Sequence, residues 1–167
     1  MKDNIILIGM PGVGKSTVGV ILAKVLGCSF IDTDLVIQEK EGRKLREIIE
    51  AEGVDGFIAA ENRICSQLQA HKAVIATGGS VVYGREAMAH LRSIGTVVYL
   101  KLEYRKLRYR LGNIKNRGVV IRNGQTLSGL FRERAPLYEK YADIIVDETG
   151  CGIEKTVRKI TEELGVI

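Results

Sequence analysis

The residues with the clearest chemistry lie at Gly9–Ser16, which read GMPGVGKS. They match the phosphate-binding consensus G-x-x-x-x-G-K-[ST], and they follow a short apolar run and precede a helical pattern, as that loop requires. The glycines let backbone N–H groups surround phosphate oxygens, and the N-terminus of the following helix adds a positive dipole. Lys15 can reach the outer phosphates, and the Ser16 hydroxyl is a ligand for Mg²⁺. We therefore expect a nucleotide to bind here, through Gly12, Val13, Gly14, Lys15, Ser16 and Thr17.

Two further clusters follow short apolar runs. Asp32 and Asp34 end the segment FIDTD, where one carboxylate can face the metal and the other a second ligand. The alternative is a turn in which Asp34 caps a helix that starts at Leu35. The segment ATGGS at 76–80 places two glycines after another apolar run, and glycine there permits close approach of a ligand to backbone N–H groups. A plain tight turn is the alternative for that segment.

The elements that position these residues alternate between strands and helices. We expect helices at 15–26 and 153–164, and two short helices within 35–53 that are divided near Gly42. Short apolar runs predict strands at 4–8, 28–32, 73–77, 96–100 and 143–146. Such strands with helical crossovers indicate a parallel sheet covered on both faces. Ligands bind beyond the carboxyl ends of the strands in these sheets, and all three clusters lie at such ends.

Composition narrows the class of protein. The 167 residues are 46% hydrophobic and 27% charged, without repeats or low-complexity tracts, which predicts one globular domain, 1–167. Three cysteines without CxxC spacing indicate neither a disulfide framework nor a zinc site. The first apolar run is too short for a signal peptide or a membrane span, so we expect a cytoplasmic protein. The segment DETG at 147–150 lies far from the Gly9 loop and predicts a surface turn, not a GTPase switch.

Cations are concentrated in one segment. The chain carries 25 Lys+Arg against 20 Asp+Glu, and eight of the cations fall between Lys101 and Arg122, where Glu103 is the one acid. A solvated helix face, a nucleic-acid patch and a cationic flap over a bound triphosphate are all consistent with this pattern. Composition does not choose among them.

With these residues assembled, the chain resembles the shikimate kinases, small P-loop kinases of the nucleoside-monophosphate-kinase type. The resemblance runs from the Gly9 loop through FIDTD, ATGGS and VVYL to RERAPLYEKYAD. It implies an α/β fold with a five-stranded parallel sheet of order 2-3-1-4-5, a substrate-binding helical region at about 33–62 and a mobile lid at about 112–124. It also implies a cytoplasmic monomer that transfers the γ-phosphate of ATP, with Mg²⁺, to a hydroxyl of a small metabolite. Shikimate, phosphorylated on its 3-hydroxyl in aromatic amino acid biosynthesis, is the leading candidate.

The resemblance also implies roles for individual residues. Asp32 would help to hold Mg²⁺ through water, and Asp34 would contact and orient the substrate hydroxyls. Gly79 would offer its backbone to the substrate, and Arg134 would bind the substrate carboxylate. At the nucleotide end, Arg117 of the lid would reach the ATP phosphates. Arg110 would pack on adenine, and the catalytic set would be Lys15, Asp34 and Arg117.

Three positions depart from the family pattern. Ser80 replaces the last glycine of a G-G-G turn, and Gly118 follows Arg117 where the family has proline. The family's F-R-x-x-E reads FIAAE, so that Ile58 stands where an arginine would hold the carboxylate. This puts the identity of the acceptor in question.

The helical segment around FIAAE can be interpreted independently. One face at 3.6 residues per turn gathers apolar side chains around Glu61: Val54, Phe57, Ile58, Ile64, Cys65 and Leu68. An unpaired buried glutamate is expensive, so Glu61 is expected to meet either another cation or the substrate. Ile58 is expected either to line the substrate pocket or to be one more core residue.

Two alternative functions are consistent with the sequence. A paralogous kinase would keep the phosphate machinery and act on another small hydroxy acid or a polyol. A nucleotide-dependent nucleic-acid-binding protein is the alternative from another class. Against the second stand the few nearby aromatics, Tyr99, Tyr104 and Tyr109, and the absence of a basic tail. We therefore expect a small-molecule substrate, with no nucleic acid or membrane as partner.

Overall fold

The computed structural model describes residues 2–112 and 119–166. Arg117 and Gly118, in the middle of the expected lid, lie outside the described residues. Within these ranges, five strands form one parallel sheet in the order β2-β3-β1-β4-β5. They are β1 Asn4–Ile8, β2 Ser29–Asp32, β3 Ala73–Ala76, β4 Gly95–Lys101 and β5 Ile144–Asp147. The expected α/β class and strand order are confirmed.

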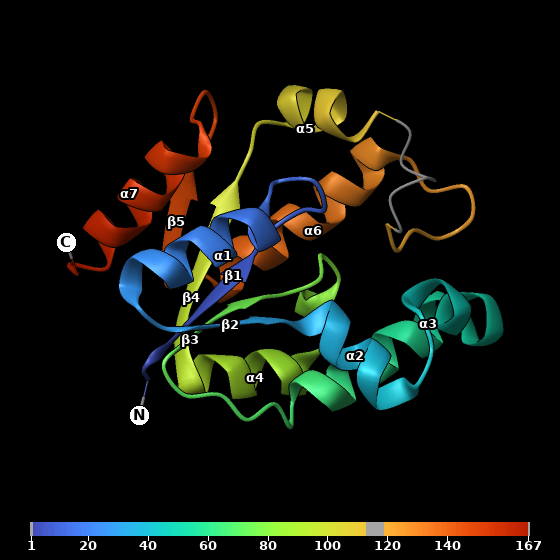
Figure 1. The fold of residues 1–167 in the computed structure, drawn as a ribbon. Helices are drawn as coiled ribbons and strands as arrows, with labels where there is room; N and C mark the ends of the chain where they lie inside the picture. The colour runs from blue at the N-terminus through green and yellow to red at the C-terminus, as the bar shows by residue number, and fades with distance from the viewer. Residues whose placement is uncertain (1, 113–118, 167) are drawn as a thin grey trace.

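Helices connect the strands. In the part of the chain that the structure describes, they are α1 Lys15–Leu26, α2 Thr33–Glu41, α3 Leu45–Cys65, α4 Arg85–Ile94, α5 Tyr104–Leu111, α6 Leu127–Tyr141 and α7 Ile153–Glu163, with a 3₁₀ turn η1 at Val81–Tyr83. Right-handed crossovers decide which face of the sheet each one covers. The chain steps from β1 to β2 in one direction across the sheet, and from β3 to β4 in the other. Accordingly, α1 packs with α7 on one face, while α4 and α6 pack against β4 on the opposite face (Figure 1).

Strand register brings the three sequence clusters to one edge of the sheet. Asp32 pairs with Ala76, and Ala76 pairs with Leu7. FIDTD, ATGGS and the Gly9 loop therefore leave the sheet side by side. This is the carboxyl edge, where ligands bind in open α/β sheets.

The start of α2 differs from expectation. The helix begins at Thr33 instead of Leu35, and its N-cap is Asp32 instead of Asp34. Asp32 ends a strand and keeps extended backbone, as an N-cap requires, and its Oδ1 accepts a hydrogen bond from the Asp34 N–H at 3.0 Å. Asp34 thus lies in the first helical turn, and its backbone N–H, not its side chain, takes part in the cap.

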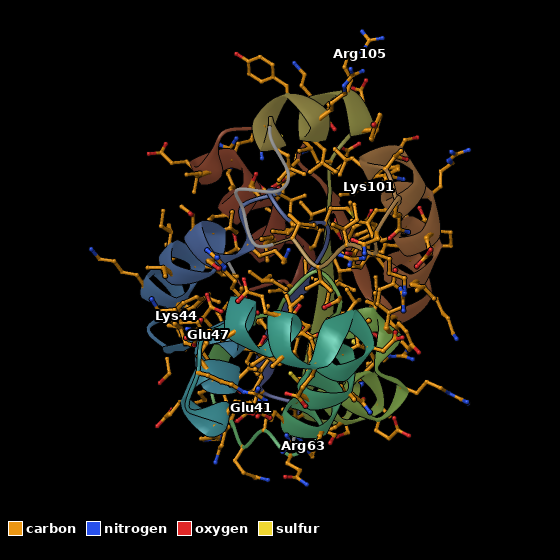
Figure 2. All side chains as sticks on the ribbon, turned by 90° about the vertical axis from the view of Figure 1, so that its right-hand side faces the viewer. Glu41, Lys44, Glu47, Arg63, Lys101 and Arg105 are labelled. Atoms are coloured by element: carbon orange, nitrogen blue, oxygen red, sulfur yellow. The ribbon has the colours of Figure 1, made fainter. Side chains whose placement is uncertain are left out.

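The helix α3 is interrupted at Gly53, where φ is 74° and ψ is 179°. This backbone conformation suits glycine, and it gives residues 54–65 a direction of their own. The first turn is capped by Glu47, whose Oε2 accepts a hydrogen bond from the Lys44 N–H at 2.6 Å. At the other end of α3, Arg63 Nη2 forms an ion pair with Glu41 Oε1 of α2 at 2.5 Å. This ion pair and the Lys44–Glu47 cap both lie on the face shown in Figure 2.

Two apolar clusters hold this architecture together. The larger one surrounds the sheet, and the smaller one joins α2 to α3 through Ile37, Ile48, Phe57 and Ile64. Val120, from the expected lid, packs against this smaller cluster. None of the helices in residues 2–112 and 119–166 is long and apolar enough to cross a membrane.

Candidate active site

The loop between β1 and α1 has the geometry of an anion cradle. Gly12 and Gly14 have φ of 85° and 94°, which favour glycine, and a Cβ on Gly12 would meet Leu111 at 2.8 Å. Lys15 begins α1 directly after this loop and is buried. Its Nζ donates hydrogen bonds to the carbonyls of Gly9 and Met10 at 2.8 and 2.9 Å. The loop therefore holds a cation at the N-terminus of a helix, where phosphate oxygens bind well.

Burial weakens the hold of Lys15 on its proton. Desolvation lowers the pKa of Lys15 to about 8, although the carboxylate of Asp34 raises it and the guanidinium of Arg134 lowers it further. An anionic phosphate beside the ammonium would favour the charged form and raise this pKa again. The charge of Lys15 is thus best stabilised when a nucleotide is bound.

Ser16 and Asp32 place two oxygen atoms beside the loop. The Ser16 hydroxyl donates a hydrogen bond to Asp32 Oδ2 at 3.0 Å. Mg²⁺ is usually bound by one or two protein oxygens together with phosphates and water, so this pair fits the ion. In residues 2–112 and 119–166 no three carboxylate, histidine or cysteine side chains converge as a metal cage.

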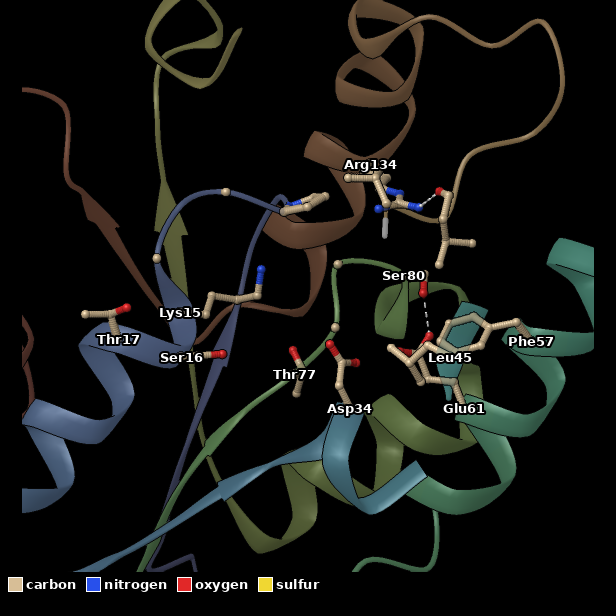
Figure 3. Close-up of a pocket in the computed structure, with 17 residues that line it drawn as sticks. Lys15, Ser16, Thr17, Asp34, Leu45, Phe57, Glu61, Thr77, Ser80 and Arg134 are labelled. Carbon is tan, nitrogen blue, oxygen red and sulfur yellow. Dashed lines mark hydrogen bonds between the residues drawn. The ribbon is translucent and has the colours of Figure 1, made fainter. Parts of the chain in front are cut away.

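A cavity of about 340 Å³ opens between the loop, the end of β3, α3 and α6. Figure 3 shows Lys15 and Ser16 at one end, with Asp34 and Glu61 on one side and Arg134 on the other. The side chains from the sequence clusters thus reach one space. Its lining is Pro11, Gly12, Gly14, Lys15, Ser16, Thr17, Asp34, Leu45, Phe57, Glu61, Thr77, Gly78, Gly79, Ser80, Val119, Val120 and Arg134.

The acidic side of the cavity holds two carboxyl groups. Burial raises the pKa of Asp34, the nearby Asp32 raises it further, and Lys15 opposes the shift. Burial also raises the pKa of Glu61, to about 7, against the hydrogen bond that Ser80 donates. Gly78 lies between the two, because a Cβ there would be 2.8 Å from Glu61 Oε2 and 3.0 Å from Asp34 Oδ1. Any side chain at this position would push the carboxylates apart.

Glu61→Gln is expected to stabilise the unliganded protein at alkaline pH. The pKa of Glu61 is about 7 in the folded state against 4.5 normally, so the folded state binds this proton more tightly. Its contribution to the free energy of unfolding therefore falls as the pH rises from about 4.5 through 7. The free energy of unfolding of the variant should exceed that of the parent by about 3 kcal/mol at pH 8. This difference should vanish near pH 4.5. Urea unfolding at both pH values measures this.

Glu163→Gln, which replaces an exposed carboxylate at the end of α7, serves as the matched control. If the difference in free energy of unfolding between Glu61→Gln and the parent is the same at both pH values, the raised pKa of Glu61 in the folded state is contradicted.

The basic side of the cavity is Arg134, which is 2% exposed. Its Nη2 donates to the Val120 carbonyl at 2.7 Å, and its Nε donates to the Tyr83 hydroxyl at 3.3 Å. A Cβ on Gly79 would lie 3.0 Å from Nη1, so glycine leaves the guanidinium its place. The Tyr138 hydroxyl donates to the Gly79 carbonyl at 2.6 Å and fixes this turn. The result is a rigid guanidinium facing a glycine backbone, an arrangement suited to a carboxylate.

A second cavity, of about 250 Å³, lies on the other side of the loop. Gly14 and Thr17 line both cavities, so one elongated ligand can reach from the second into the first. Arg110 lines the second cavity, where its Nη1 donates to the Val13 carbonyl at 3.3 Å and lies 3.4 Å from Glu148 Oε1. This position fits the base end of a nucleotide whose phosphates occupy the loop.

Comparisons with known proteins agree with this geometry. The family model for shikimate kinase matches residues 11–165. The chain belongs to the shikimate kinase family. It is 34% identical to the shikimate kinase of Thiobacillus denitrificans over 99% of this chain and 92% of the relative. It is 42% identical to that of Actinobacillus succinogenes over 86% of this chain and 84% of the relative. The structure of shikimate kinase from Acinetobacter baumannii in complex with shikimate superposes with a TM-score of 0.87, at 33% identity, over 98% and 93% of the two chains.

Membership of the shikimate kinase family establishes a phosphotransferase with an alcohol acceptor, with ATP as the donor that the family implies. The departures from the family pattern have structural positions. Ser80 lines the first cavity and is bonded to Glu61. Ile58 is half-buried and does not belong to the lining, which takes Phe57 and Glu61 from the same helix.

The sequence missed several residues of the site. Leu45, Val119 and Val120 form part of the wall of the first cavity; they fall within the expected substrate-binding region and lid, but none of them was expected individually as a site residue. Glu148 lies in the segment DETG, for which a surface turn was expected, yet it is 3% exposed and lines the second cavity. Burial raises the pKa of Glu148 to about 7, against the cations Arg110 and Lys15. Its position just after β5, at the carboxyl edge of the sheet, was the available signal.

Proposed function

We propose that the chain transfers the γ-phosphate of ATP to the 3-hydroxyl of shikimate in a Mg²⁺-dependent reaction. The observation that carries this proposal is the first cavity, in which Lys15 of the phosphate loop lies at one end and Asp34 lies across the space from Arg134 of α6. An acceptor held by its carboxylate at Arg134 would present a hydroxyl toward the phosphate loop. Such positioning, together with electrostatic stabilisation, supplies most of the catalysis in phosphoryl transfer.

At the donor end, the proposed contacts follow from the loop. The backbone of Gly12, Val13 and Gly14 would surround the phosphates, with Lys15 and the side chain of Thr17 beside them. Ser16, and Asp32 through water, would hold Mg²⁺, whose charge offsets that of the phosphates. Arg110 would contact adenine in the second cavity. Arg117, outside the described residues, is proposed to reach the phosphates from the lid.

At the acceptor end, Asp34 would accept a hydrogen bond from the reacting hydroxyl and orient it. A strong base is not needed in a loose transition state, so orientation is its main proposed role. Gly79 would offer its backbone and Arg134 its guanidinium, while Glu61 faces the same space. We assign Ile58 no contact with the substrate, because it does not line the cavity. We also propose that the protein acts as a monomer with one catalytic domain, 1–167.

The proposal is tested by ADP release from ATP with Mg²⁺ and a panel of acceptors. The panel holds shikimate, a cyclic polyol without a carboxylate and an acyclic hydroxy acid. We expect ADP release above the ATPase background with shikimate, and a kcat/KM at least about a hundredfold higher than with the polyol, because the polyol makes no charged contact with Arg134. Equal turnover of shikimate and polyol would contradict the proposed acceptor. Turnover that persists when EDTA removes the metal would contradict the role of Mg²⁺.

A further inference from the structure

Ser80 and Glu61 form a buried pair that joins the turn after β3 to α3. Ser80 is 2% exposed and Glu61 is 1% exposed. The Ser80 hydroxyl donates its hydrogen to Glu61 Oε1 at 2.6 Å (Figure 3). A hydroxyl has one hydrogen to donate, so this bond uses the donor capacity of Ser80 fully. One oxygen of the carboxyl group is thereby anchored.

The other oxygen of Glu61 is not bonded to any residue that the structure describes. Oε2 is buried and makes no hydrogen bond within residues 2–112 and 119–166. A Cβ on Gly78 would lie 2.8 Å from Oε2 and 3.0 Å from Asp34 Oδ1, and Gly78, Asp34 and Glu61 all line the first cavity. Leaving a buried carboxyl oxygen without a partner is costly, so its orientation calls for a donor from a ligand.

Among the residues that the structure describes, Ser80 is the one hydrogen-bond donor to the Glu61 side chain. Lys15 of α1 and Arg134 of α6 act on Glu61 only through their charges, Asp34 of α2 repels it, and Cys65 lies one turn further along α3. Ile58, on the preceding turn of α3, carries no polar group. The hydrogen bond from Ser80 therefore determines which way the carboxyl group faces.

We propose that Ser80 is a positioning residue that orients Glu61, so that Glu61 Oε2 accepts a hydrogen bond from the acceptor hydroxyl next to the one oriented by Asp34. This inference rests on the proposed function and adds a specificity determinant to it. The two carboxylates on either side of Gly78 would each accept a hydrogen bond from one of two neighbouring hydroxyls. An acceptor with only one hydroxyl in this region would leave Oε2 without its partner.

Ser80→Ala is the test, with Ser80→Thr as the conservative variant that keeps the hydroxyl. In Ser80→Ala the KM for shikimate should rise about tenfold, the KM for ATP should stay within about twofold, and kcat should change little. The pKa of Glu61 should also rise, because the bond that favours its ionised form is lost. The acid limb of kcat/KM for shikimate should then move up by about one pH unit. Ser80→Thr should restore both values.

A deoxy analogue of shikimate without the 4-hydroxyl isolates the contact. The parent should bind the analogue about tenfold more weakly than shikimate, and Ser80→Ala should bind both alike. Ser66→Ala removes a serine hydroxyl at the end of α3, where it bonds the Arg63 carbonyl, and should change neither KM nor the pH profile.

Each result has a separate meaning. If the parent releases no ADP with shikimate, the proposed function fails, whatever Ser80 does. If the parent is active and Ser80→Ala lowers the melting temperature without changing the KM for shikimate or the pH profile, the role of Ser80 is structural and the inference is overturned.

Discussion

Lys15→Met is expected to lower kcat at least about a thousandfold. In the described part of the chain, Lys15 is the one lysine that lines the first cavity, and its ammonium donates to the loop carbonyls of Gly9 and Met10. Removing one preorganised charge from a transferring phosphoryl group costs about two to five orders of magnitude in rate. ADP release at saturating ATP and shikimate measures the loss. Methionine fills a volume similar to that of lysine, so the loop should keep its packing.

Stability provides the control for Lys15. Because burial lowers the pKa of Lys15 to about 8, its positive charge destabilises the folded state of the unliganded protein. The melting temperature of Lys15→Met should therefore equal or exceed that of the parent. Lys24→Ala, an exposed lysine in the last turn of the same helix, should leave kcat unchanged. If Lys15→Met kept more than about a tenth of the parental kcat, the Gly9 loop would not be the phosphate site.

Arg134→Ala is expected to raise the KM for shikimate about a hundredfold, with the KM for ATP changed by less than about threefold. Arg134 lines the acceptor end of the cavity and is buried, so a carboxylate there would make charged hydrogen bonds out of water. Such bonds contribute about 1.5–3 kcal/mol each, and one bond corresponds to roughly ten- to a hundredfold in affinity. Steady-state kinetics with each substrate varied in turn measures both KM values.

Two controls separate recognition from folding at Arg134. Arg132→Ala removes an exposed arginine two residues earlier on α6 and should leave both KM values unchanged. Shikimate amide, which lacks the carboxylate charge, should be a poor substrate for the parent and should lose little more with Arg134→Ala. If Arg134→Ala discriminated between shikimate and its amide as strongly as the parent does, the carboxylate would bind elsewhere.

The sequence predicted the parts of the site that depend on local backbone chemistry. The Gly9 loop is recognisable because its glycines, lysine and serine must stand at fixed spacing between a strand and a helix. Asp32 and Gly79 could be placed because parallel strands bring their carboxyl ends to one edge. The strand order came from the resemblance to a family and is the order observed.

The sequence did not predict the parts that depend on side-chain direction. Helical periodicity put Ile58 and Glu61 on one face, but residues three apart lie about 60° from each other around a helix, so the two need not reach the same space. Glu61 then lines the cavity and Ile58 does not. The bond between Ser80 and Glu61 depends on rotamers of residues 19 positions apart. Glu148 lies in a turn whose sequence is mostly polar. Its burial depends on packing against other parts of the fold, which the sequence of the turn does not show.

Through its hydrogen bond to the Val120 carbonyl, the Arg134 guanidinium connects helix α6 to the segment expected to form the lid. The same side chain lines the acceptor end of the cavity and holds the main chain three residues beyond Arg117, the proposed phosphate contact. Occupancy at the acceptor end and the placement of that segment are thereby linked through a single group. Such linkage is reciprocal, because the factor by which shikimate changes the affinity for ATP equals the factor by which ATP changes the affinity for shikimate. The two substrates of this enzyme would then act as each other's effectors.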